Sequence, residues 1–217
     1  METPRLSLRY PSDTDLEALN RVADQGIHDP SWMPFDIPWT EDPSDIRRRR
    51  SLQHWWQLRA SWEPEKWSLT LMVKEGDTVV GVQSLIGNNF TLSREVSTGS
   101  WLGRAHQGRG IGKEMRAAIL HLAFAGLGAR RAISAAFEDN IASITVSRAL
   151  GYRENGDEIK IRRGVPSRSI RFVIDRGDWE NRRRDDIQIQ GHEPCLPMFG
   201  LDPTPSPALP TRGREHG

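Results

Sequence analysis

A glycine-rich turn immediately before an amphipathic helix is the feature that most constrains this chain. The turn reads Gln107-Gly108-Arg109-Gly110-Ile111-Gly112 and follows a strand-like segment, residues 96–102. Its glycines leave backbone N–H groups uncovered at the helix N-terminus, where those groups and the helix dipole favour an anion such as pyrophosphate. No Gly-Lys-Ser/Thr follows, which excludes a Walker loop, and the spacing excludes a Rossmann fingerprint. A glycine loop that only turns the chain is the alternative.

The segments on either side of the turn predict a mixed sheet flanked by helices. Alternating polar and apolar residues predict strands, and apolar residues at helical spacing predict helices. The helix after the turn has apolar residues on one face at Ile111, Met115, Ala118, Ile119 and Leu122. We expect strands at residues 5–10, 67–73, 78–86, 95–102, 132–137, 158–163 and 169–174, and helices from residue 13, at 44–60, at 111–127 and at 141–150.

Composition narrows the class of protein. The chain has 217 residues, 27% of them charged, with a net charge of +1. This balance gives no reason to expect nucleic acid as a partner. A single cysteine, Cys195, excludes an intramolecular disulfide framework and fits a reducing compartment. No secretory signal or membrane-spanning apolar run is visible, so we expect a cytoplasmic protein.

Domain organisation follows from a change in composition near the C-terminus. We expect one domain over residues 1–180, an extension over 181–201, and a disordered tail over 202–217 that is rich in Pro, Gly and Arg. Within the extension, residues 186–190 alternate like a strand. They could join a sheet in their own chain or in a neighbouring one, which makes a homodimer or larger oligomer plausible.

A second motif lies about thirty residues after the glycine turn. Asn140 and Ser143 follow a predicted strand and open a short helix that ends in Leu150-Gly151-Tyr152. Their spacing places both side chains on the same side of the first helical turn. Taken alone, Asn140 could be only a helix N-cap and Ser143 a first-turn serine. Together with the glycine turn, they favour a binding site.

With these motifs in this order, the chain resembles the GNAT family of N-acetyltransferases, near the RimJ/RimL-type ribosomal-protein N-terminal acetyltransferases. The resemblance covers roughly residues 3–180. An actinobacterial subgroup, with a mycobacterial member described as a probable succinyltransferase, is also resembled by His28-Asp29-Pro30, Met33-Pro34-Phe35, Pro38-Trp39 and Ser100-Trp101-Leu102-Gly103. The implied fold is α/β (α+β): a mixed, mostly antiparallel, twisted sheet of six to seven strands flanked by helices, with the fourth and fifth strands splayed apart.

The resemblance also implies roles for particular residues. The splayed fourth strand would bind the pantetheine arm of coenzyme A through backbone groups of Trp101, Leu102 and Gly103, and Asn140 would bind the same arm. Ser143 matches the position of the general acid near the thioester sulfur, whereas Tyr152 is expected to pack. The pyrophosphate would be held by Gln107, Gly108, Arg109, Gly110, Ile111, Gly112 and Lys113. The implied co-substrate is acetyl-CoA or succinyl-CoA, and the acceptor is an amine on a small molecule or a protein.

Acyl transfer to an amine requires a neutral amine, a polarised carbonyl and a leaving thiolate. At pH 7 a lysine amine is only about 0.04% neutral, whereas an α-amine is roughly 10–15% neutral. A lysine acceptor therefore needs a much stronger base. The backbone N–H of Leu102 is the expected oxyanion donor. Glu95 is our candidate base, and His28, Asp29, Glu138 and Asp139 are the alternatives.

An aromatic, proline-rich loop is expected to line the acceptor and acyl pocket, with His28, Trp32, Met33, Phe35 and Trp39 as its candidates. These side chains could equally cover the first two helices. A succinyl carboxylate would need a cation, and neither Arg21 nor Arg104 stands out in the sequence.

Two further patterns indicate what the protein does not bind. The run Arg47-Arg48-Arg49-Arg50 could contact nucleic acid, but four consecutive residues spread around a helix and favour a solvated face. No metal site is expected, because the histidines and the lone cysteine lack ligand spacing.

The sequence predicts an acyl-CoA-dependent N-acyltransferase that works by direct attack in a ternary complex. The alternatives are a non-catalytic, CoA-binding GNAT-like sensor and a ribosome-associated binding module.

Overall fold

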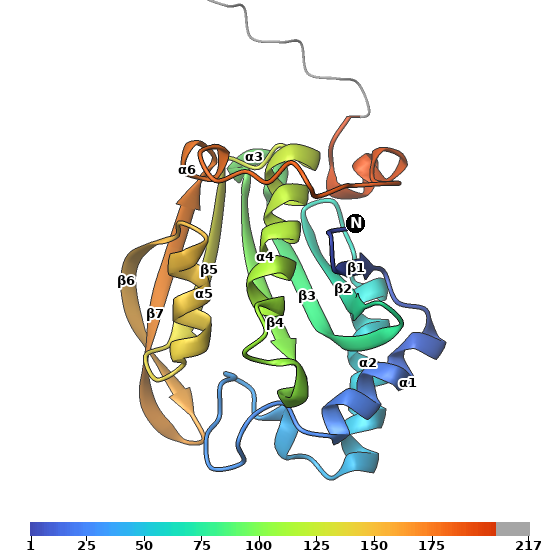
Figure 1. The fold of residues 1–217 in the computed structure, drawn as a ribbon, viewed down its shortest axis with the longest axis vertical. Coiled ribbons are helices and arrows are strands. Elements are labelled where there is room, and N and C mark those ends of the chain that lie inside the picture. The colour runs from blue at the N-terminus through green and yellow to red at the C-terminus, as the bar shows by residue number, and fades with distance from the viewer. Residues whose placement is uncertain (203–217) are drawn as a thin grey trace, which may run out of the picture.

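The structure is a computed structural model and describes residues 1–202. It contains one seven-stranded sheet in the order β1-β2-β3-β4-β5-β7-β6 (Figure 1). The strands are β1 (Leu6–Arg9), β2 (Lys66–Glu75), β3 (Thr78–Asn88), β4 (Glu95–Leu102), β5 (Arg131–Phe137), β6 (Arg153–Arg162) and β7 (Val165–Asp175). The helices are α1 (Asp13–Asp24), α2 (Ser44–Ala60), α3 (Phe90–Ser93), α4 (Ile111–His121), α5 (Ile141–Ala149) and α6 (Arg176–Glu180).

Every neighbouring pair of strands is antiparallel except β4 and β5, which are parallel. Their parallel register is short, and the two strands separate toward their C-terminal ends (Figure 1). The predicted GNAT fold, including the splay between the fourth and fifth strands, is therefore confirmed.

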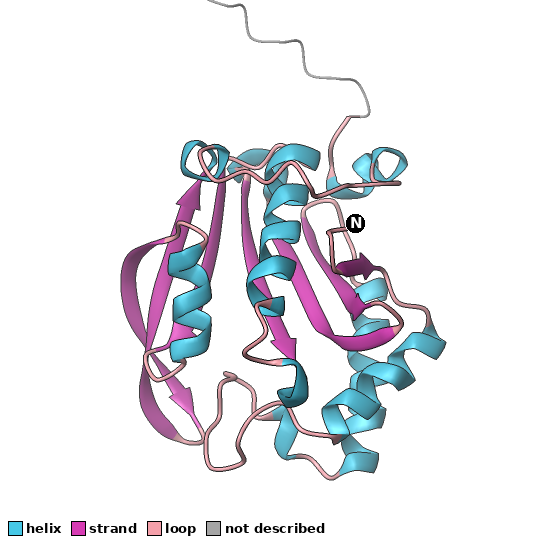
Figure 2. Ribbon diagram, in the orientation of Figure 1, coloured by secondary structure: helices cyan, strands magenta, loops and turns pink. Residues whose placement is uncertain are grey.

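The sheet is covered on both faces. Helices α4 and α5 lie on one face, with α4 over the central strands (Figure 2). The apolar positions predicted for α4 are all buried in the main core. A second cluster lies on the opposite face, where Leu16 and Leu19 of α1 and Trp55 of α2 pack against Met72 and Val82. Strands β2 and β3 thus lie between two layers of packed side chains.

Local sequence signals explain several element boundaries. Ser12 caps α1 by accepting from Asp15 N–H, and the Asp15 carboxylate accepts from Ser12 N–H, which forms a capping box. Gly151 ends α5 with φ +92°, a conformation that glycine adopts without strain. The predicted helix at 44–60 and the strand at 95–102 have the expected bounds.

The helix predicted over 111–127 changes geometry before its end. Regular α-helix stops at His121, and residues 122–126 form a wider turn that closes with a bond from Leu127 N to Leu122 O at 2.9 Å. Gly126 lies there against side chains of Ile189 and His192 from the C-terminal segment, which crosses this end of α4 (Figure 1). Glycine weakens a regular helix, and the packed segment favours the wider turn.

Other differences concern short or peripheral elements. Helices α3 and α6 were not predicted, and β6 and β7 begin at residues 153 and 165, earlier than expected. In the extension, the backbone of Gln188 forms one antiparallel bridge with Glu2, in which each N–H donates to the other residue's carbonyl oxygen at 2.9 Å. The strand-like segment therefore pairs with the chain's own N-terminal residues. Of the predicted tail, 202–217, residues 203–217 lie outside the described part. No helix within residues 1–202 has both the length and the apolar character needed to cross a membrane.

Candidate active site

A gap between β4 and β5 forms the centre of the candidate site. The two strands pair at only three positions, the last being Ser97 opposite Ile133. Beyond that point β4 continues to Leu102 and β5 to Phe137, but the two strands no longer pair with each other. Because a strand edge without a neighbour presents main-chain donors and acceptors, this gap can hold an extended ligand in the manner of an added strand.

The direction of the β4 amides determines which residues can bind in the gap. Gly103 N–H donates to Val80 O at 2.9 Å, toward β3, and Gly103 O accepts from His106 N. Successive residues of a strand direct their N–H groups to opposite sides. The amides of Leu102 and Ser100 therefore point toward the gap, whereas those of Trp101 and Gly103 point toward β3. Among the three residues predicted to bind pantetheine, Leu102 is the one with its N–H on the correct side.

The glycine turn adopts a conformation that only glycine takes up easily. Gly108 and Gly110 have φ of +73° and +81°, and Gly110 is the N-cap of α4. The first intrahelical bond runs from Glu114 N to Gly110 O, at 3.1 Å. No side chain within residues 1–202 caps this end, so the N–H groups of residues 111–113 remain available. This arrangement fits a bound pyrophosphate.

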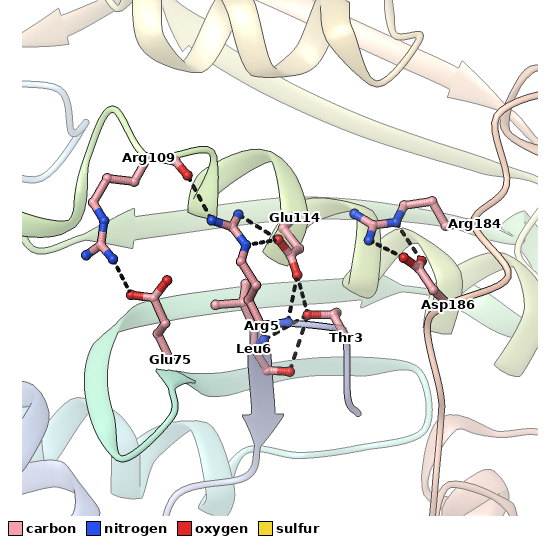
Figure 3. A network of polar contacts seen from close by, with 8 residues as sticks. All are labelled: Thr3, Arg5, Leu6, Glu75, Arg109, Glu114, Arg184 and Asp186. Atoms are coloured by element: carbon pink, nitrogen blue, oxygen red, sulfur yellow. Dashed lines mark hydrogen bonds and ion pairs between the residues drawn. The ribbon is translucent and has the colours of Figure 1, made fainter.

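A polar network fixes the position of the glycine turn (Figure 3). Arg5 donates from Nη1 to Arg109 O at 3.1 Å and from Nε to Glu114 Oε2 at 2.8 Å. Thr3 Oγ1 donates to the same carboxylate at 2.6 Å. Burial raises the pKa of Glu114, but the hydrogen bonds from Thr3 and Arg5 outweigh burial, so the pKa is lowered overall. Arg109 also pairs with Glu75, at 2.7 Å.

Gln107 connects the turn to the edge of the gap. Its Nε2 donates to Leu102 O at 3.0 Å and to Ile27 O at 2.6 Å. The side chain therefore joins the end of β4 to the loop after α1.

The N-terminus of α5 faces the same region. Asn140 caps the helix by accepting from Ser143 N at 3.1 Å. One turn later, Ser147 Oγ donates to Ser143 O at 3.0 Å. Asn140 is therefore the N-cap of α5. Because the capping bond uses Oδ1, Asn140 would bind a ligand through its Nδ2 group.

The aromatic loop crosses from α1 toward the β6–β7 hairpin. Phe35 packs on Trp39, and Trp39 on Trp101 of β4, with ring centroids 5.5 and 5.8 Å apart. Arg162 donates to Met33 O at 3.0 Å, and Arg163 donates to Pro30 O at 2.9 Å. His28 donates to or accepts from Thr40 Oγ1 at 2.7 Å and lies edge-on to Trp32 and Phe35. The loop is thus fixed at both ends and reaches β4.

A cavity of about 560 Å³ lies beside the gap, beneath this loop. The register of the strands places its floor on the sheet face opposite α4 and α5, around Ile133, Ala135 and Arg171. Its acidic side chains are Asp36, Glu95 and Glu158, and its basic ones are Lys160 and Arg171.

The family model for acetyltransferase (GNAT) domains matches residues 5–153, about two thirds of the chain. The chain belongs to the GNAT acetyltransferase family. Among solved structures, it is similar to RimL, a ribosomal L7/L12 α-N-protein acetyltransferase in complex with coenzyme A. The identity is 18%, the match covers 80% of this chain and 95% of that one, and the TM-score is 0.64. It is also similar to the dodecameric spermidine N-acetyltransferase from Vibrio cholerae, at 16% identity, 83% and 99% coverage and a TM-score of 0.62.

Not all the predicted catalytic residues of this GNAT protein lie together. Glu95 begins β4 and Leu102 ends it, so seven steps along the strand separate them, roughly 23 Å. Glu95 lines the cavity near its partner Arg131, 3.8 Å away. Asp29 lies on the surface near Arg104, and Asp139 pairs with Arg162.

The structure also brings together residues that sequence reasoning missed. In the cavity, Lys160 Nζ lies 2.6 Å from Asp36 and 3.6 Å from Glu158. Burial lowers the pKa of Lys160, but these carboxylates outweigh burial and raise it overall. Beneath α4, Arg116 is buried against Ser100 and Ser147. No local signal identifies either group, because each is assembled from distant segments.

Proposed function

We propose that this protein transfers an acyl group from a CoA thioester to a primary amine, by direct attack in a ternary complex. The observation that carries the proposal is the gap-facing edge of β4 next to an uncapped helix N-terminus. An unpaired strand edge suits the amide-bearing pantetheine arm, and the bare amides suit the pyrophosphate. The family membership supports the same donor.

The pyrophosphate and the pantetheine arm of coenzyme A then have named binding groups. The amides of residues 107–113 hold the pyrophosphate. Leu102 and the Nδ2 group of Asn140 bind the pantetheine arm and the thioester. Arg5 and Glu114 act indirectly, because they fix the turn rather than touch the ligand.

The amine enters from the cavity on the opposite face. Its nitrogen attacks the thioester carbonyl carbon, and the carbonyl oxygen takes up negative charge that Leu102 N–H stabilises. The carbon–sulfur bond breaks, and its electron pair leaves with the sulfur. The new amide nitrogen loses its extra proton to water in the cavity. The Ser143 hydroxyl passes a proton to the thiolate and takes one back from that water, so the serine ends unchanged. A thiolate with a pKa near ~8.5 needs only modest help, so one hydroxyl suffices.

The cavity carries both acidic and basic side chains. Lys160 pairs with Asp36 and Glu158, and Glu95 lies 3.8 Å from Arg131, so charge alone does not select the acceptor. We assign Glu95 to the lining of the acceptor cavity rather than to contact with the reacting atoms. An α-amine is the less demanding acceptor, because roughly 10–15% of it is neutral at pH 7. The protein named in the first similar structure acts on a protein α-amine, and the second on spermidine, so both classes belong in the test.

A donor and acceptor panel tests the proposal. CoA release is measured from acetyl-, propionyl- and succinyl-CoA with peptide α-amines, lysine and polyamines. Titration calorimetry with CoA is run in parallel. Turnover with any pair supports the enzyme, whereas binding without turnover favours the sensor alternative. Absence of both binding and turnover overturns the proposal.

Ser143→Ala should lower kcat roughly 10- to 100-fold and leave CoA affinity unchanged, because only the proton donor is lost. Thr145→Ala, on the exposed side of α5, is the matched control. An unchanged kcat in Ser143→Ala removes Ser143 from the mechanism without affecting the rest of the proposal.

Oligomer formation is a separate proposal. The edge strand β6 exposes Ile159 and Ile161, two apolar residues on one face of the strand. Exposed apolar residues on an edge strand favour self-association. Light scattering after size-exclusion chromatography measures it, and a monomer at working concentration refutes it.

The ribosome-associated module has weaker support. Arg47 and Arg48 pair with Asp24, and Arg50 pairs with Asp42, so most of the arginine run is already neutralised by the chain's own carboxylates.

A further inference from the structure

One cation that lines the acceptor cavity has no counter-ion from the chain. Lys160 pairs with Asp36 at 2.6 Å and with Glu158 at 3.6 Å. Glu95 has its partner on β5, 3.8 Å away. Arg171 of β7 lines the same cavity, and within residues 1–202 no carboxylate pairs with its guanidinium. Most of the cavity's charges therefore balance one another, and Arg171 is the exception.

A β-bulge in the outer hairpin of the sheet, β6 and β7, makes room for this guanidinium (Figure 1). The register shifts between Glu154 and Asp157 of β6. This shift sets Asn155 and Gly156 opposite Arg171. Gly156 has φ +82°, and a Cβ there would lie 3.0 Å from Arg171 Nη2. Bulges redirect side chains and are frequent beside active sites, and here the guanidinium lies over a bare glycine.

The register of β7 places Arg171 beside the open part of the gap. Arg171 pairs with Ala135 of β5. Because β5 pairs with β4 only as far as Ile133, Ala135 lies two residues beyond the point where the strands separate. Adjacent strands are about 4.7–4.9 Å apart, so Arg171 is one strand away from the edge of the gap. The arginine and the gap therefore share the same cavity.

The carboxylates of β6 beside the bulge are already paired. Asp157 pairs with Arg168 at 2.9 Å. Glu158 pairs with Lys160 rather than with Arg171. An arginine side chain is always charged and presents a planar fork of N–H donors that matches a carboxylate. A free guanidinium in a cavity is therefore suited to a carboxylate that arrives with a ligand.

We propose that Arg171 binds a carboxylate of the acceptor, so that the preferred acceptor is an amine that also carries a carboxylate. The side-chain amide of Asn155, which also lines the cavity, donates to the same carboxylate. The amine then extends from Arg171 toward the gap. This proposal rests on the proposed function, because it names the acceptor class of the same site. A polyamine has no group that pairs with Arg171 and is the less favoured acceptor.

Matched pairs of acceptors test the proposal. Steady-state kinetics of the full chain are measured with the best donor of the acyl-CoA panel. The acceptors are ω-amino acids of increasing length and their primary amides, and peptides whose second residue is Asp or Asn. The wild type should favour the carboxylate member of a pair about 10-fold in kcat/KM, mostly through KM, because a charge-assisted hydrogen bond is lost in the amide. Added salt should reduce this preference by screening.

Substitutions assign the effect to one side chain. Arg171→Met should abolish the preference and change kcat/KM for the amide acceptors by less than about 2-fold, because these acceptors offer no charge to pair with Arg171. Arg171→Lys should keep part of the preference, since the charge remains without the planar fork. Arg171→Glu should shift the preference toward spermidine. Arg168→Met, an exposed position on the same strand outside the cavity, is the matched control and should behave as the wild type.

Gly156→Ala tests the seat of the guanidinium without removing its charge. The added Cβ would displace Arg171 Nη2, so the carboxylate preference should fall several-fold. Alanine is also strained at φ +82°, so thermal unfolding of this variant is measured alongside its kinetics.

The outcomes are distinct. Preference for a carboxylate confined to the amino acids identifies a small-molecule acceptor, and preference confined to the peptides identifies a protein acceptor; either supports the role of Arg171. Equal kcat/KM for both members of every pair in the wild type, or equal losses with both in Arg171→Met, overturns that role while leaving the acyltransferase intact. Absence of turnover and of CoA binding with every donor instead overturns the proposed function itself.

Discussion

The polar network behind the glycine turn makes a quantitative prediction for Glu114→Gln. The Glu114 side chain is only 7% exposed, and it accepts bonds from Thr3 Oγ1, Arg5 N and Arg5 Nε. Glutamine keeps the shape but removes the charge and turns N–H groups toward the Arg5 donors. Each hydrogen bond to a charged group contributes about 1.5–3 kcal/mol, and partial exposure of Arg5 reduces this by screening. We expect a loss of about 2 kcal/mol in the free energy of unfolding.

Two measurements test this value. For a chain of this size each kcal/mol shifts Tm by about 2–4 °C, so Glu114→Gln should melt about 4–8 °C lower. Urea unfolding followed by tryptophan fluorescence gives the free energy directly. The pKa of Glu114 is lowered from its ordinary value of 4.5, so the Glu114 carboxylate stabilises the fold fully above pH 4.5. This stabilisation is lost as the pH falls through the pKa of Glu114 in the folded protein. The difference between wild type and variant should therefore close in acid.

A double-mutant cycle with Arg5→Met isolates the pair. We expect a coupling energy above about 1 kcal/mol, and a several-fold weaker affinity for CoA in both single variants because Arg109 O loses its anchor. Glu17→Gln, in an exposed pair on α1, is the control and should change stability by less than about 0.5 kcal/mol. A coupling below about 0.5 kcal/mol, or unchanged CoA affinity, refutes the reasoning.

Three further predictions concern other parts of the molecule. Gly81→Ala places a Cβ 2.1 Å from Trp101 O, so this substitution should push β4 away from β3. We expect it to destabilise the protein by about 1–3 kcal/mol in denaturation and to reduce turnover in activity assays. Gly99→Ala is the control for both assays, because its Cβ would meet nothing within 4 Å. Burial raises the pKa of Asp24, but bonds from α2 outweigh it and hold the pKa at about 2 instead of 3.8. Asp24→Asn should therefore cost about 1–2 kcal/mol near neutral pH, and pH-dependent melting should show that this difference disappears as pH falls from 3.8 toward 2. Arg163→Ala frees the aromatic loop and should raise KM for the amine several-fold in steady-state assays with CoA affinity unchanged; an unchanged KM shows that the loop does not shape the acceptor site.

The sequence determined features that depend on neighbouring residues. The strand at residues 95–102, the capped start of α1 and the left-handed glycines before α4 follow from alternation, capping chemistry and backbone freedom. All of these act over a few residues, so the chain specifies them before it folds. The anion-binding character of the glycine turn belongs to this group. The resemblance to a family, rather than local pattern, supplied the splay between β4 and β5.

Tertiary structure alone decided the chemistry around that splay. Arg116 lies outside the apolar face of α4, so the sequence pattern predicts a surface residue. It is buried because α5 packs beside α4. The approach of Lys160 to Asp36 joins positions 124 residues apart. Glu95 and Leu102 share a strand, yet its extended geometry keeps them far apart. A side chain's neighbours across the fold set its burial and its pairing of charge, and those neighbours are fixed by the packing of whole elements.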